Sequence, residues 1–303
     1  MKWKLDQYKG VSPAVATPFK SNQDIDEEAL RDLLTWYLDA GVHGISIAGS
    51  QGEFFALSTE ERLRIIEIAM EVVNGKVPVY AGTGAVSTRE SIYITQAAQA
   101  MGVDVVMLIT PYFIQPSATE LVVHYSEIAT ATKLPVLLYN NPPRTSVNIT
   151  PETFQKCYEI ENIVGIKDSS GDMTQIIEYL RLTDRQALVY SGRDTLTLDI
   201  ILQGGAGAIS PAANVFPKLV IRLYDAAKAG DFDTARHISD VLAPLRMAWA
   251  WASFPVVIKE AMALVGRGNG IARAPISGLS EEKKKSLRKI LAAIENFELK
   301  TCS

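Results

Sequence analysis

The chain has 303 residues, of which 48% are hydrophobic and 21% charged, so it holds enough apolar material for a sizeable core and is not a disordered chain. This length fits either two domains or one large α/β domain. Thirty basic and thirty-four acidic residues give a net charge of −4. That balance supplies neither the positive field of a nucleic-acid binder nor attraction to an anionic membrane surface, so neither is an expected partner.

The cysteines and histidines indicate neither a disulfide framework nor a metal site. Cys157 and Cys302 are far apart and form no CxxC motif, which suits a reducing compartment. His43, His124 and His237 lack metal-ligand spacing. The N-terminus has no apolar signal segment, and no apolar window reaches transmembrane length. We therefore expect a soluble, cytoplasmic protein.

Short β-rich runs recur along the chain and are separated by single amphipathic, helix-like stretches. Strands that are separated by one helix each must be parallel, because a parallel neighbour needs a crossover and the helix supplies it. Their almost continuous apolar character fits burial on both faces. The eight predicted strands are residues 11–19, 44–48, 77–81, 104–110, 135–139, 163–167, 187–191 and 206–210.

Start and stop signals mark many of the helices between these strands. Ser58 and Glu61 have the spacing of a capping box, and Ser87 and Glu90 repeat it. Pro151 stands at a first helical position, where its missing N–H costs nothing. Three glycines follow helical stretches at the place where a left-handed residue is favoured, namely Gly41, Gly75 and Gly102.

Eight such units fit either a closed (β/α)8 TIM barrel or a doubly wound open sheet. The regular spacing, with no linker-like stretch, favours the barrel. We predict the barrel over residues 1–216. Residues 217–303 should hold the last barrel helix and a C-terminal helical region that packs on the barrel or contacts another subunit. Its predicted helices are residues 217–229, 232–251, 255–265 and 281–296.

In a barrel of this kind the functional site forms at the carboxyl ends of the strands, and Lys167 lies at one of them. Strand alternation places Lys167 on the same face as Gly165, which leaves room for a long side chain inside the barrel. A dry interior disfavours the ammonium ion, so the pKa of this amine should fall, and a neutral amine attacks carbonyl carbons. The alternative is a structural lysine that reaches solvent or pairs with Asp168.

Tyr139 is the second notable residue at a strand end. It shares a strand face with Leu137, so it should also point inward at the same end of the barrel. A tyrosine there can shuttle a proton if a second hydroxyl completes a relay. Otherwise it is a core tyrosine with a satisfied hydroxyl. Because Lys167, Tyr139 and Ser50 all lie at strand ends, the functional interpretation is favoured.

Three segments at these strand ends carry a resemblance to a known family. They are 49–53 (GSQGE), 139–145 (YNNPPRT) and 165–168 (GIKD), in that order and at those separations. Together they resemble the dihydrodipicolinate synthase / N-acetylneuraminate lyase family of class I, Schiff-base-forming aldolases. Segments 191–194 (SGRD) and 205–209 (GAGAI) extend the resemblance over nearly the whole chain.

The resemblance implies a (β/α)8 barrel with a C-terminal helical region, a homotetramer, and no metal or organic cofactor. It implies that Lys167 attacks C2 of pyruvate, or of a 2-oxo acid that yields pyruvate, to form an iminium. Tyr139 would be the proton shuttle, linked to the Ser50 hydroxyl. Gly192 and Ile209 match positions whose backbone helps to hold the bound keto acid.

The sequence departs from the family pattern at two of these positions. Many members have a second hydroxyl residue after the one that matches Ser50, and this chain has Gln51. That leaves open how the turn, with its N–H groups, contacts the pyruvate carboxylate. The family's relay tyrosine, which joins the proton path between subunits, corresponds to Phe113. The adjacent Tyr112 is not an obvious substitute, because neighbouring strand residues face opposite ways. The missing relay hydroxyl argues against a lysine-pathway synthase.

Two arginines point to an anionic substrate. Arg144 matches the arginine that lysine-pathway synthases of this family use near the carboxylate of the second substrate. Arg193 stands where those synthases tend to carry an acidic residue. A guanidinium binds a carboxylate through two hydrogen bonds, so the pair suggests an anionic distal group. A solvated surface arginine is the alternative for Arg193.

The leading hypothesis is a lyase that forms or cleaves a carbon–carbon bond between pyruvate and an aldehyde, with an acidic 2-oxo-3-deoxy acid as the joined compound. The same imine chemistry permits 4-hydroxy-tetrahydrodipicolinate synthesis from pyruvate and aspartate semialdehyde, or dehydration of a 2-keto-3-deoxy acid. A paralogue that only binds keto acids is a non-enzymatic alternative. A nicotinamide-dependent oxidoreductase rests only on the glycines of residues 82–84, which lack the third glycine of the dinucleotide fingerprint.

Overall fold

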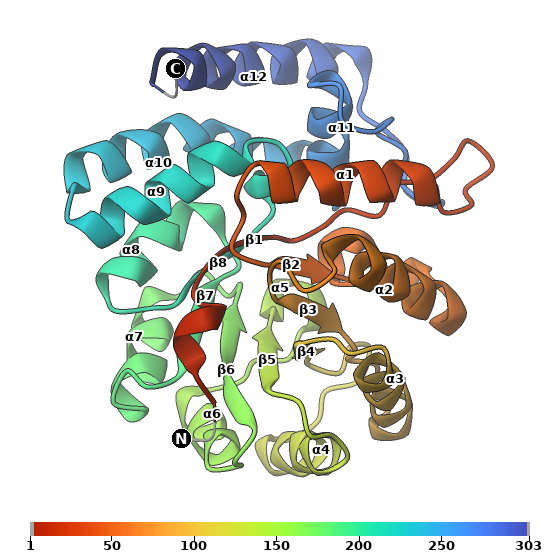
Figure 1. Cartoon of the computed structure of the whole chain (residues 1–303), viewed down its shortest axis with the longest axis vertical. Coiled ribbons are helices and arrows are strands. Elements are labelled where there is room, and N and C mark those ends of the chain that lie inside the picture. Colours follow the sequence, from red (N-terminus) through yellow and green to blue (C-terminus); the bar gives the residue numbers. More distant parts are fainter. Residues whose placement is uncertain (1–2, 302–303) are drawn as a thin grey trace.

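Eight short strands follow one another around a barrel, and helices surround them (Figure 1). The structure is a computed structural model that describes residues 3–301. The strands are β1 (Gly10–Pro13), β2 (Ile45–Ile47), β3 (Val79–Gly82), β4 (Val105–Ile109), β5 (Val136–Asn140), β6 (Ile163–Asp168), β7 (Leu188–Ser191) and β8 (Gly207–Ser210). The helices are α1 (Glu27–Asp39), α2 (Thr59–Val73), α3 (Thr88–Ala100), α4 (Ala118–Thr130), α5 (Pro142–Thr145), α6 (Pro151–Tyr158), α7 (Met173–Leu182), α8 (Thr197–Leu202), α9 (Pro217–Ala229), α10 (Phe232–Met247), α11 (Val256–Leu264) and α12 (Glu281–Thr301).

All neighbouring strands are parallel, and their order is β1-β8-β7-β6-β5-β4-β3-β2. The ends of this sheet meet through a parallel bridge between Ala14 and Ser46, beside which Val15 N donates to Ser46 O at 2.9 Å. The sheet therefore curls into a nearly closed barrel. The predicted TIM barrel is confirmed, and the open doubly wound sheet is wrong.

The first strand is shorter than predicted. Residues 11–19 read as one β-rich run, but β1 ends at Pro13, which has no N–H to donate to a neighbour. Ala14 N still donates to Ser210 O of β8, whereas Val15 N turns to Ser46 beside β2. The predicted run 11–19 therefore pairs first with β8 and then, from Val15, with the segment of β2 on its other side.

The predicted start signals form with one exception. Ser58 Oγ accepts from Glu61 N at 3.2 Å while Glu61 Oε2 accepts from Ser58 N at 2.9 Å, which completes the capping box of α2. Ser87 Oγ likewise accepts from Glu90 N. The Glu90 carboxylate does not return this bond, because it accepts from Thr59 Oγ1 of α2 instead.

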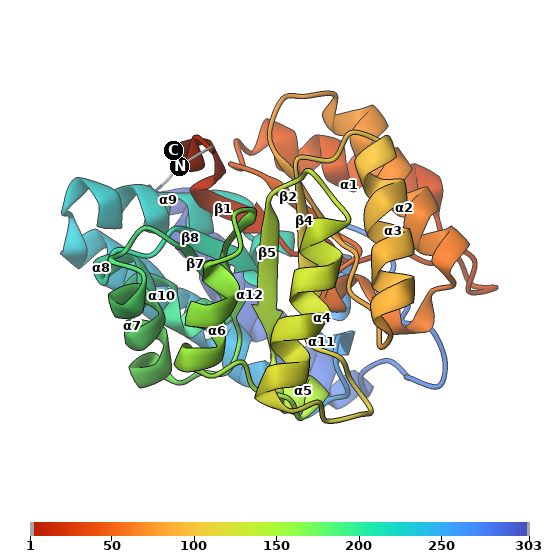
Figure 2. The ribbon, with the colours of Figure 1, turned by 90° about the horizontal axis from the view of Figure 1, so that it is seen from below.

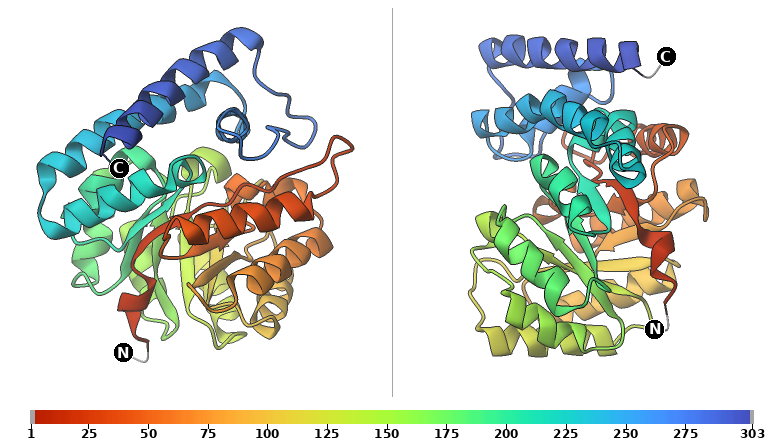
Figure 3. Two further views of the ribbon diagram at one scale, coloured as in Figure 1. Left: turned by 45° about the horizontal axis from the view of Figure 1, so that its top comes forward. Right: turned by 90° about the vertical axis from the view of Figure 1, so that its left-hand side faces the viewer.

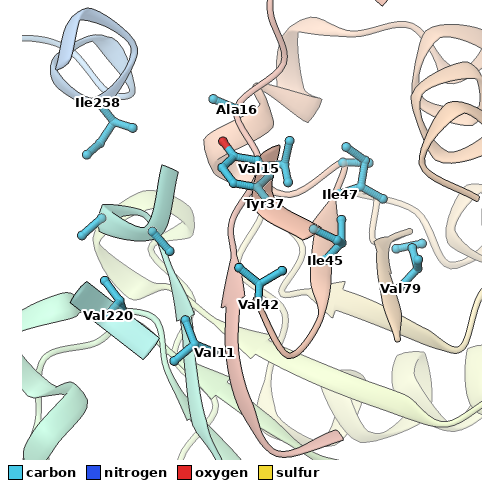
Figure 4. Packing of buried hydrophobic residues seen from close by; sticks show 14 of the residues in the cluster. Val11, Val15, Ala16, Tyr37, Val42, Ile45, Ile47, Val79, Val220 and Ile258 are labelled. Atoms are coloured by element: carbon cyan, nitrogen blue, oxygen red, sulfur yellow. The ribbon is translucent and has the colours of Figure 1, made fainter. Parts of the chain in front are cut away.

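Buried apolar side chains form two layers. An inner cluster fills the barrel and includes Leu137, Tyr139 and Ile209. An outer cluster lies between the strands and the helices, and Figure 4 shows part of it, with Val11 and Ile45 of the barrel near Tyr37 of α1. Because both strand faces are covered, the strands carry apolar residues at nearly every position, as parallel strands do.

The C-terminal helices stack on one side of the barrel, outside α9 and α1, with α12 outermost (Figure 3). α9 contacts β1, α8 and α10, and side chains of α10, α11 and α12 belong to the same outer cluster as the barrel helices. Figure 2 shows α11 at the same end of the barrel as α5, which follows the carboxyl end of β5. The C-terminal region can therefore reach the functional end of the barrel. No helix within residues 3–301 is long and apolar enough to cross a membrane.

Candidate active site

A cavity of about 230 Å³ opens at the carboxyl ends of the strands. Strand ends supply part of its wall, and the segment at and after the end of α10 supplies another part. The lining residues are Ala14, Gln51, Tyr139, Asn141, Pro143, Arg144, Lys167, Ser169, Gly192, Arg193, Pro211, Arg246, Trp249, Ala250 and Phe254. Five of the seven predicted site residues thus reach this cavity.

Lys167 projects from β6 into the cavity and is only 3% exposed. Its Nζ lies 4.2 Å from the centre of the Tyr139 ring. Burial lowers the pKa of the Lys167 amine, and the opposing effects of Tyr139 and Asp194 do not cancel that shift. The side chain therefore favours the neutral amine more than an exposed lysine does.

Asp168 does not neutralise Lys167. Its carboxylate accepts from Asn140 Nδ2 at 2.9 Å and from the Ser170 backbone N–H at 2.8 Å, on the other side of β6. Strand alternation explains this division, because neighbouring residues of a strand face opposite ways. The paired-lysine alternative is not the arrangement in this structure.

Gly165 has a different role from the one predicted. A Cβ atom at this position would lie 2.0 Å from the Leu188 carbonyl oxygen of β7, so no larger residue fits. The glycine permits close approach of two strand backbones, and this approach fixes β6 beside β7. It contributes to the position of Lys167 through the backbone.

Tyr139 lies on β5 directly beside Lys167, since the two residues are register partners. Asn141 Nδ2 donates to Tyr139 Oη at 2.8 Å. Burial alone raises the pKa of Tyr139, but the Lys167 ammonium and hydrogen bonding by Ser50, Ser169 and Asn141 together lower it. A hydroxyl that gives up its proton more readily than an ordinary tyrosine suits proton transfer beside an amine.

The turn after β2 brings Ser50 and Gln51 to the same place. These residues begin a short 3-10 helix (Ser50–Gly52), and both are buried. The Ser50 hydroxyl helps to lower the pKa of Tyr139, although its Oγ makes no hydrogen bond of full geometry with the described residues. Both polar atoms of the Gln51 amide are also buried without a partner there. The Gln51 amide lines the cavity and is free to bind a polar ligand there, whereas Ser50 is not among the lining residues.

Gly192 and Ile209 occupy different environments. A Cβ atom on Gly192 would lie 2.0 Å from Ser169 Oγ and 3.0 Å from Lys167 Cε, so a side chain here would displace the Ser169 hydroxyl and press against the lysine. Ile209 is fully buried in the inner cluster, and its side chain is not among those that line the cavity. Its predicted role concerns the backbone and stays a prediction.

Three arginines line the cavity, one more than the sequence indicated. Arg144 stacks on Phe254, with Cζ 4.6 Å from the ring centre. Arg193 lies against Gly171 after β6. Arg246, which we did not predict, comes from the last turn of α10 and stacks on Trp249 at 4.3 Å. Nothing in the local sequence of α10 marks Arg246, because only the packing of the C-terminal region brings it to the barrel.

A comparison with known proteins identifies the family. The family model described as "Dihydrodipicolinate synthetase family" matches residues 7–294. The chain belongs to this family. A protein of Thermodesulfovibrio yellowstonii named 4-hydroxy-tetrahydrodipicolinate synthase is 42% identical over 94% of this chain and 97% of its own length. A protein of the same name from Methanopyrus kandleri is 41% identical over 94% of this chain and 96% of its own length.

Solved structures of the dihydrodipicolinate synthetase family have the same fold. The 4-hydroxy-tetrahydrodipicolinate synthase of Methylacidiphilum fumariolicum SolV superposes with a TM-score of 0.93 at 34% identity, over 96% of this chain and 97% of that one. The dihydrodipicolinate synthase of Acinetobacter baumannii, complexed with pyruvate, has a TM-score of 0.92 at 35% identity, over 95% and 99%. The chain is accordingly a class I, pyruvate-dependent lyase, as the family resemblance implied.

Phe113, which the sequence resemblance matches to a relay tyrosine, does not line the cavity. Its side chain is fully exposed, and its backbone has a φ of 72°, which a bulky residue rarely adopts. Tyr112 instead packs against Phe54, with 5.6 Å between ring centres. Within the described part of this chain, Tyr139 is the tyrosine that lines the cavity.

The remaining polar motifs lie away from the cavity. The backbone carbonyls of Gly82 and Gly84, considered for a nucleotide, both accept hydrogen bonds from Arg62 Nη2, at 2.8 and 3.0 Å. No group of three or more His, Cys, Asp or Glu side chains in residues 3–301 is arranged to hold a metal ion. His43 accepts from Val11 N, and His124 bonds Thr88 Oγ1.

Proposed function

We propose that this chain forms or cleaves a carbon–carbon bond between pyruvate and an aldehyde, and that the joined compound is an acidic 2-oxo-3-deoxy acid. The observation that carries this proposal is the position of the Lys167 amine. It is 3% exposed, lies 4.2 Å from the Tyr139 ring centre, and opens on a cavity with no carboxylate in its wall. A buried amine without a paired carboxylate is held for reaction with a carbonyl group.

The proposed condensation has four steps. The neutral Lys167 amine adds to C2 of pyruvate, and loss of water leaves an iminium. Tyr139, which has given its proton to the departing water, takes a proton from C3, and an enamine forms because the positive nitrogen accepts the electron pair of the C=N π bond while the C–H pair forms the new C=C bond. The enamine carbon attacks the aldehyde carbon, forming the new bond, while the aldehyde oxygen takes a proton from the Tyr139 hydroxyl. Water then adds to the iminium and releases the 2-oxo acid and the free amine. Cleavage runs through the same steps in reverse.

The pyruvate carboxylate has suitable partners beside Lys167. We assign it to the turn that carries Ser50 and Gln51, where the Gln51 amide is buried and unpaired among the described residues. Gly192 lines the same cavity as Lys167, and a side chain there would collide with Ser169 Oγ, so the glycine keeps this wall free of a larger group. The backbone of Ile209 belongs to the same proposal. An amide donor that a ligand must satisfy favours a bound carboxylate.

4-Hydroxy-tetrahydrodipicolinate synthesis from pyruvate and aspartate semialdehyde is the second candidate. The relatives of that name at about 40% identity favour it, as does Arg144 at the mouth of the cavity. The absence of a hydroxyl at Phe113 and the arginine at position 193 weigh against it. Dehydration of a 2-keto-3-deoxy acid uses the same iminium and differs only in the bond that breaks.

We also propose a homotetramer in the cytoplasm. The fully exposed Phe113 and the half-exposed Ile114 beside it present apolar surface in the segment between β4 and α4. Exposed apolar surface of this kind is commonly covered by another subunit. Sedimentation or light scattering measures the oligomeric state, and a monomer at micromolar concentration would contradict this part of the proposal.

Reduction with borohydride in the presence of pyruvate tests the enzyme proposal. It should leave a stable pyruvyl adduct on Lys167, located by peptide mass spectrometry, and omission of pyruvate should leave the lysine unmodified. An adduct on a different lysine, or none, contradicts the proposal. An adduct at Lys167 without turnover of any acidic 2-oxo-3-deoxy acid or aldehyde would favour the keto-acid-binding paralogue.

A further inference from the structure

The charged side chains that line the cavity are all positive. Lys167 and three arginines, Arg144, Arg193 and Arg246, line it, and no Asp or Glu is among the lining residues of the described chain. The proposed chemistry uses Lys167 for the keto group and the Ser50–Gln51 turn for the pyruvate carboxylate. The three guanidinium groups therefore remain for the other end of the substrate.

Arg246 is held at the cavity without a carboxylate bound to it. It stacks on Trp249, and its Nε is buried with no hydrogen-bond partner in the part of the chain that the structure describes. Burial lowers the pKa of Arg246, and the charges of Arg193 and Arg144 lower it further, while Asp194 opposes them. The Asp194 carboxylate itself accepts hydrogen bonds from Ser210 Oγ and Ala212 N, at 2.5 and 3.2 Å.

The other two arginines are also unneutralised. Arg193 Nη2 reaches only the Ser170 carbonyl oxygen, at 3.5 Å, and Arg144 stacks on an apolar ring. Within residues 3–301 neither makes an ion pair. The three positive guanidinium groups repel one another in the empty cavity, and this repulsion raises the energy of the unliganded site. An anionic ligand would reduce the repulsion. A guanidinium fork fits carboxylate and phosphate oxygens best.

We propose that Arg246, with Arg193 and Arg144, binds a second anionic group of the substrate, so that the aldehyde partner carries a distal carboxylate or phosphate and no ammonium group. This inference rests on the proposed function and specifies its substrate class. An ammonium group would need an acidic partner to offset its desolvation, and the cavity wall offers only neutral acceptors such as Asn141 and Ser169.

Two matched pairs of aldehydes test the inference in the condensation with pyruvate. Succinate semialdehyde and aspartate semialdehyde differ only by the ammonium group, and glyceraldehyde 3-phosphate and glyceraldehyde differ only by the phosphate. In each pair the anionic aldehyde without ammonium should have a kcat/KM that is higher by about 10- to 100-fold, the usual value of a charged hydrogen bond. The pair with the larger kcat/KM identifies carboxylate or phosphate as the distal group. Equal values within both pairs, or a preference for aspartate semialdehyde, would overturn the inference.

Substitution at Arg246 assigns the effect to this residue. Arg246→Gln should raise KM for the preferred anionic aldehyde by about 10-fold or more with a much smaller change in kcat, and Arg246→Lys should restore part of the loss. Arg236→Gln is the matched control, because Arg236 is an exposed residue of the same helix that pairs with Asp233. An unchanged KM in Arg246→Gln would also overturn the inference.

The pyruvyl adduct distinguishes failure of this inference from failure of the proposed function. If Arg246→Gln still forms the Lys167 adduct with pyruvate but shows no loss of preference for anionic aldehydes, only the distal site is wrong. If the unsubstituted protein forms no adduct at all, the proposed function fails first. Adduct formation also shows that the variant is folded.

Discussion

Two lysines within residues 3–301 are buried, and they differ in what surrounds them. Lys167 is 3% exposed and Lys259, on α11, is 4% exposed. The Lys259 ammonium donates to the Glu53 carboxylate and to the Ile271 carbonyl oxygen, the latter at 2.8 Å. Lys167 forms no ion pair within residues 3–301, although the charge of Asp194 acts on it, and its Nζ lies 4.2 Å from the Tyr139 ring centre.

The two lysines also differ in the size of the cavity that each one borders. Lys259 borders a cavity of about 10 Å³, which has room for at most one water molecule. The cavity at Lys167 holds about 230 Å³ and admits a small substrate. Burial lowers the pKa of both amines, that of Lys259 to about 8. Burial alone therefore does not make a nucleophile, and the missing counterion and the open space decide which lysine reacts.

The largest effect should follow substitution of Lys167. Lys167→Ala should abolish the pyruvyl adduct and reduce turnover by on the order of 10⁴-fold or more, because loss of a covalent nucleophile has effects of that size. Lys259 should remain unmodified by pyruvate and borohydride in both proteins. Peptide mass spectrometry after reduction measures this directly. Labelling of Lys259 at a comparable level would remove the distinction between the two lysines.

Tyr139→Phe should separate adduct formation from turnover. Turnover should fall by about 10²- to 10⁴-fold, the usual contribution of a general acid–base group, while the Lys167 adduct still forms. Tyr139 raises the pKa of Lys167, so its loss lowers that pKa. Because only the neutral amine attacks, the rise in trapping rate with pH should move to lower pH.

A second tyrosine provides the control for this measurement. Tyr190 is also fully buried inside the barrel, and its hydroxyl donates to the Tyr8 carbonyl away from the cavity. Tyr190→Phe should leave the pH dependence of trapping in place. A Tyr139→Phe protein with nearly full turnover would show that another group carries the proton.

Lys259→Met should lower the stability of the fold and leave adduct formation at Lys167 intact. It leaves the fully buried Glu53 carboxylate without its ammonium partner, which should lower the free energy of unfolding by about 3–5 kcal/mol. Urea unfolding measures the loss, and Lys133→Met, at an exposed lysine, is the control. The folded variant should still form the Lys167 adduct. A loss below about 1 kcal/mol would mean that the buried pair contributes little.

Gln51→Ala should have the smallest effect. Gln51 and Glu53 are two residues apart in one turn, yet Gln51 lines the Lys167 cavity and Glu53 pairs with Lys259. If the Gln51 amide binds the pyruvate carboxylate, KM for pyruvate should rise by about 2- to 10-fold, the equivalent of one hydrogen bond. Steady-state kinetics with varied pyruvate measures it. A lower KM would show that the amide obstructs the carboxylate.

Short-range sequence patterns were enough to predict where most strands lie. They were also enough to predict that Tyr139 and Lys167 lie beside each other at the strand ends. Alternation along β5 and β6 puts Tyr139 and Lys167 on inward faces, and parallel pairing makes them neighbours. The capping box at Ser58 is likewise complete within four residues. At Ser87 the local pattern predicted the bond from Glu90 N to Ser87 Oγ but not the partner of the Glu90 carboxylate. That partner, Thr59, belongs to another helix.

By itself the sequence predicted the order of strands and helices and the inward position of Lys167, since each follows from periodicity or from adjacent residues, and it favoured the barrel over an open sheet, whereas the Ala14–Ser46 bridge of the folded chain closes the barrel. Only the tertiary structure decided that Arg246 of α10 joins Arg193 at the cavity, and that Lys259 pairs with Glu53 across 206 positions of the chain. The physical reason is that helix packing, which sums many weak contacts, sets where the C-terminal region lies. A local sequence pattern therefore cannot predict which charged residue from a distant part of the chain will lie at the site.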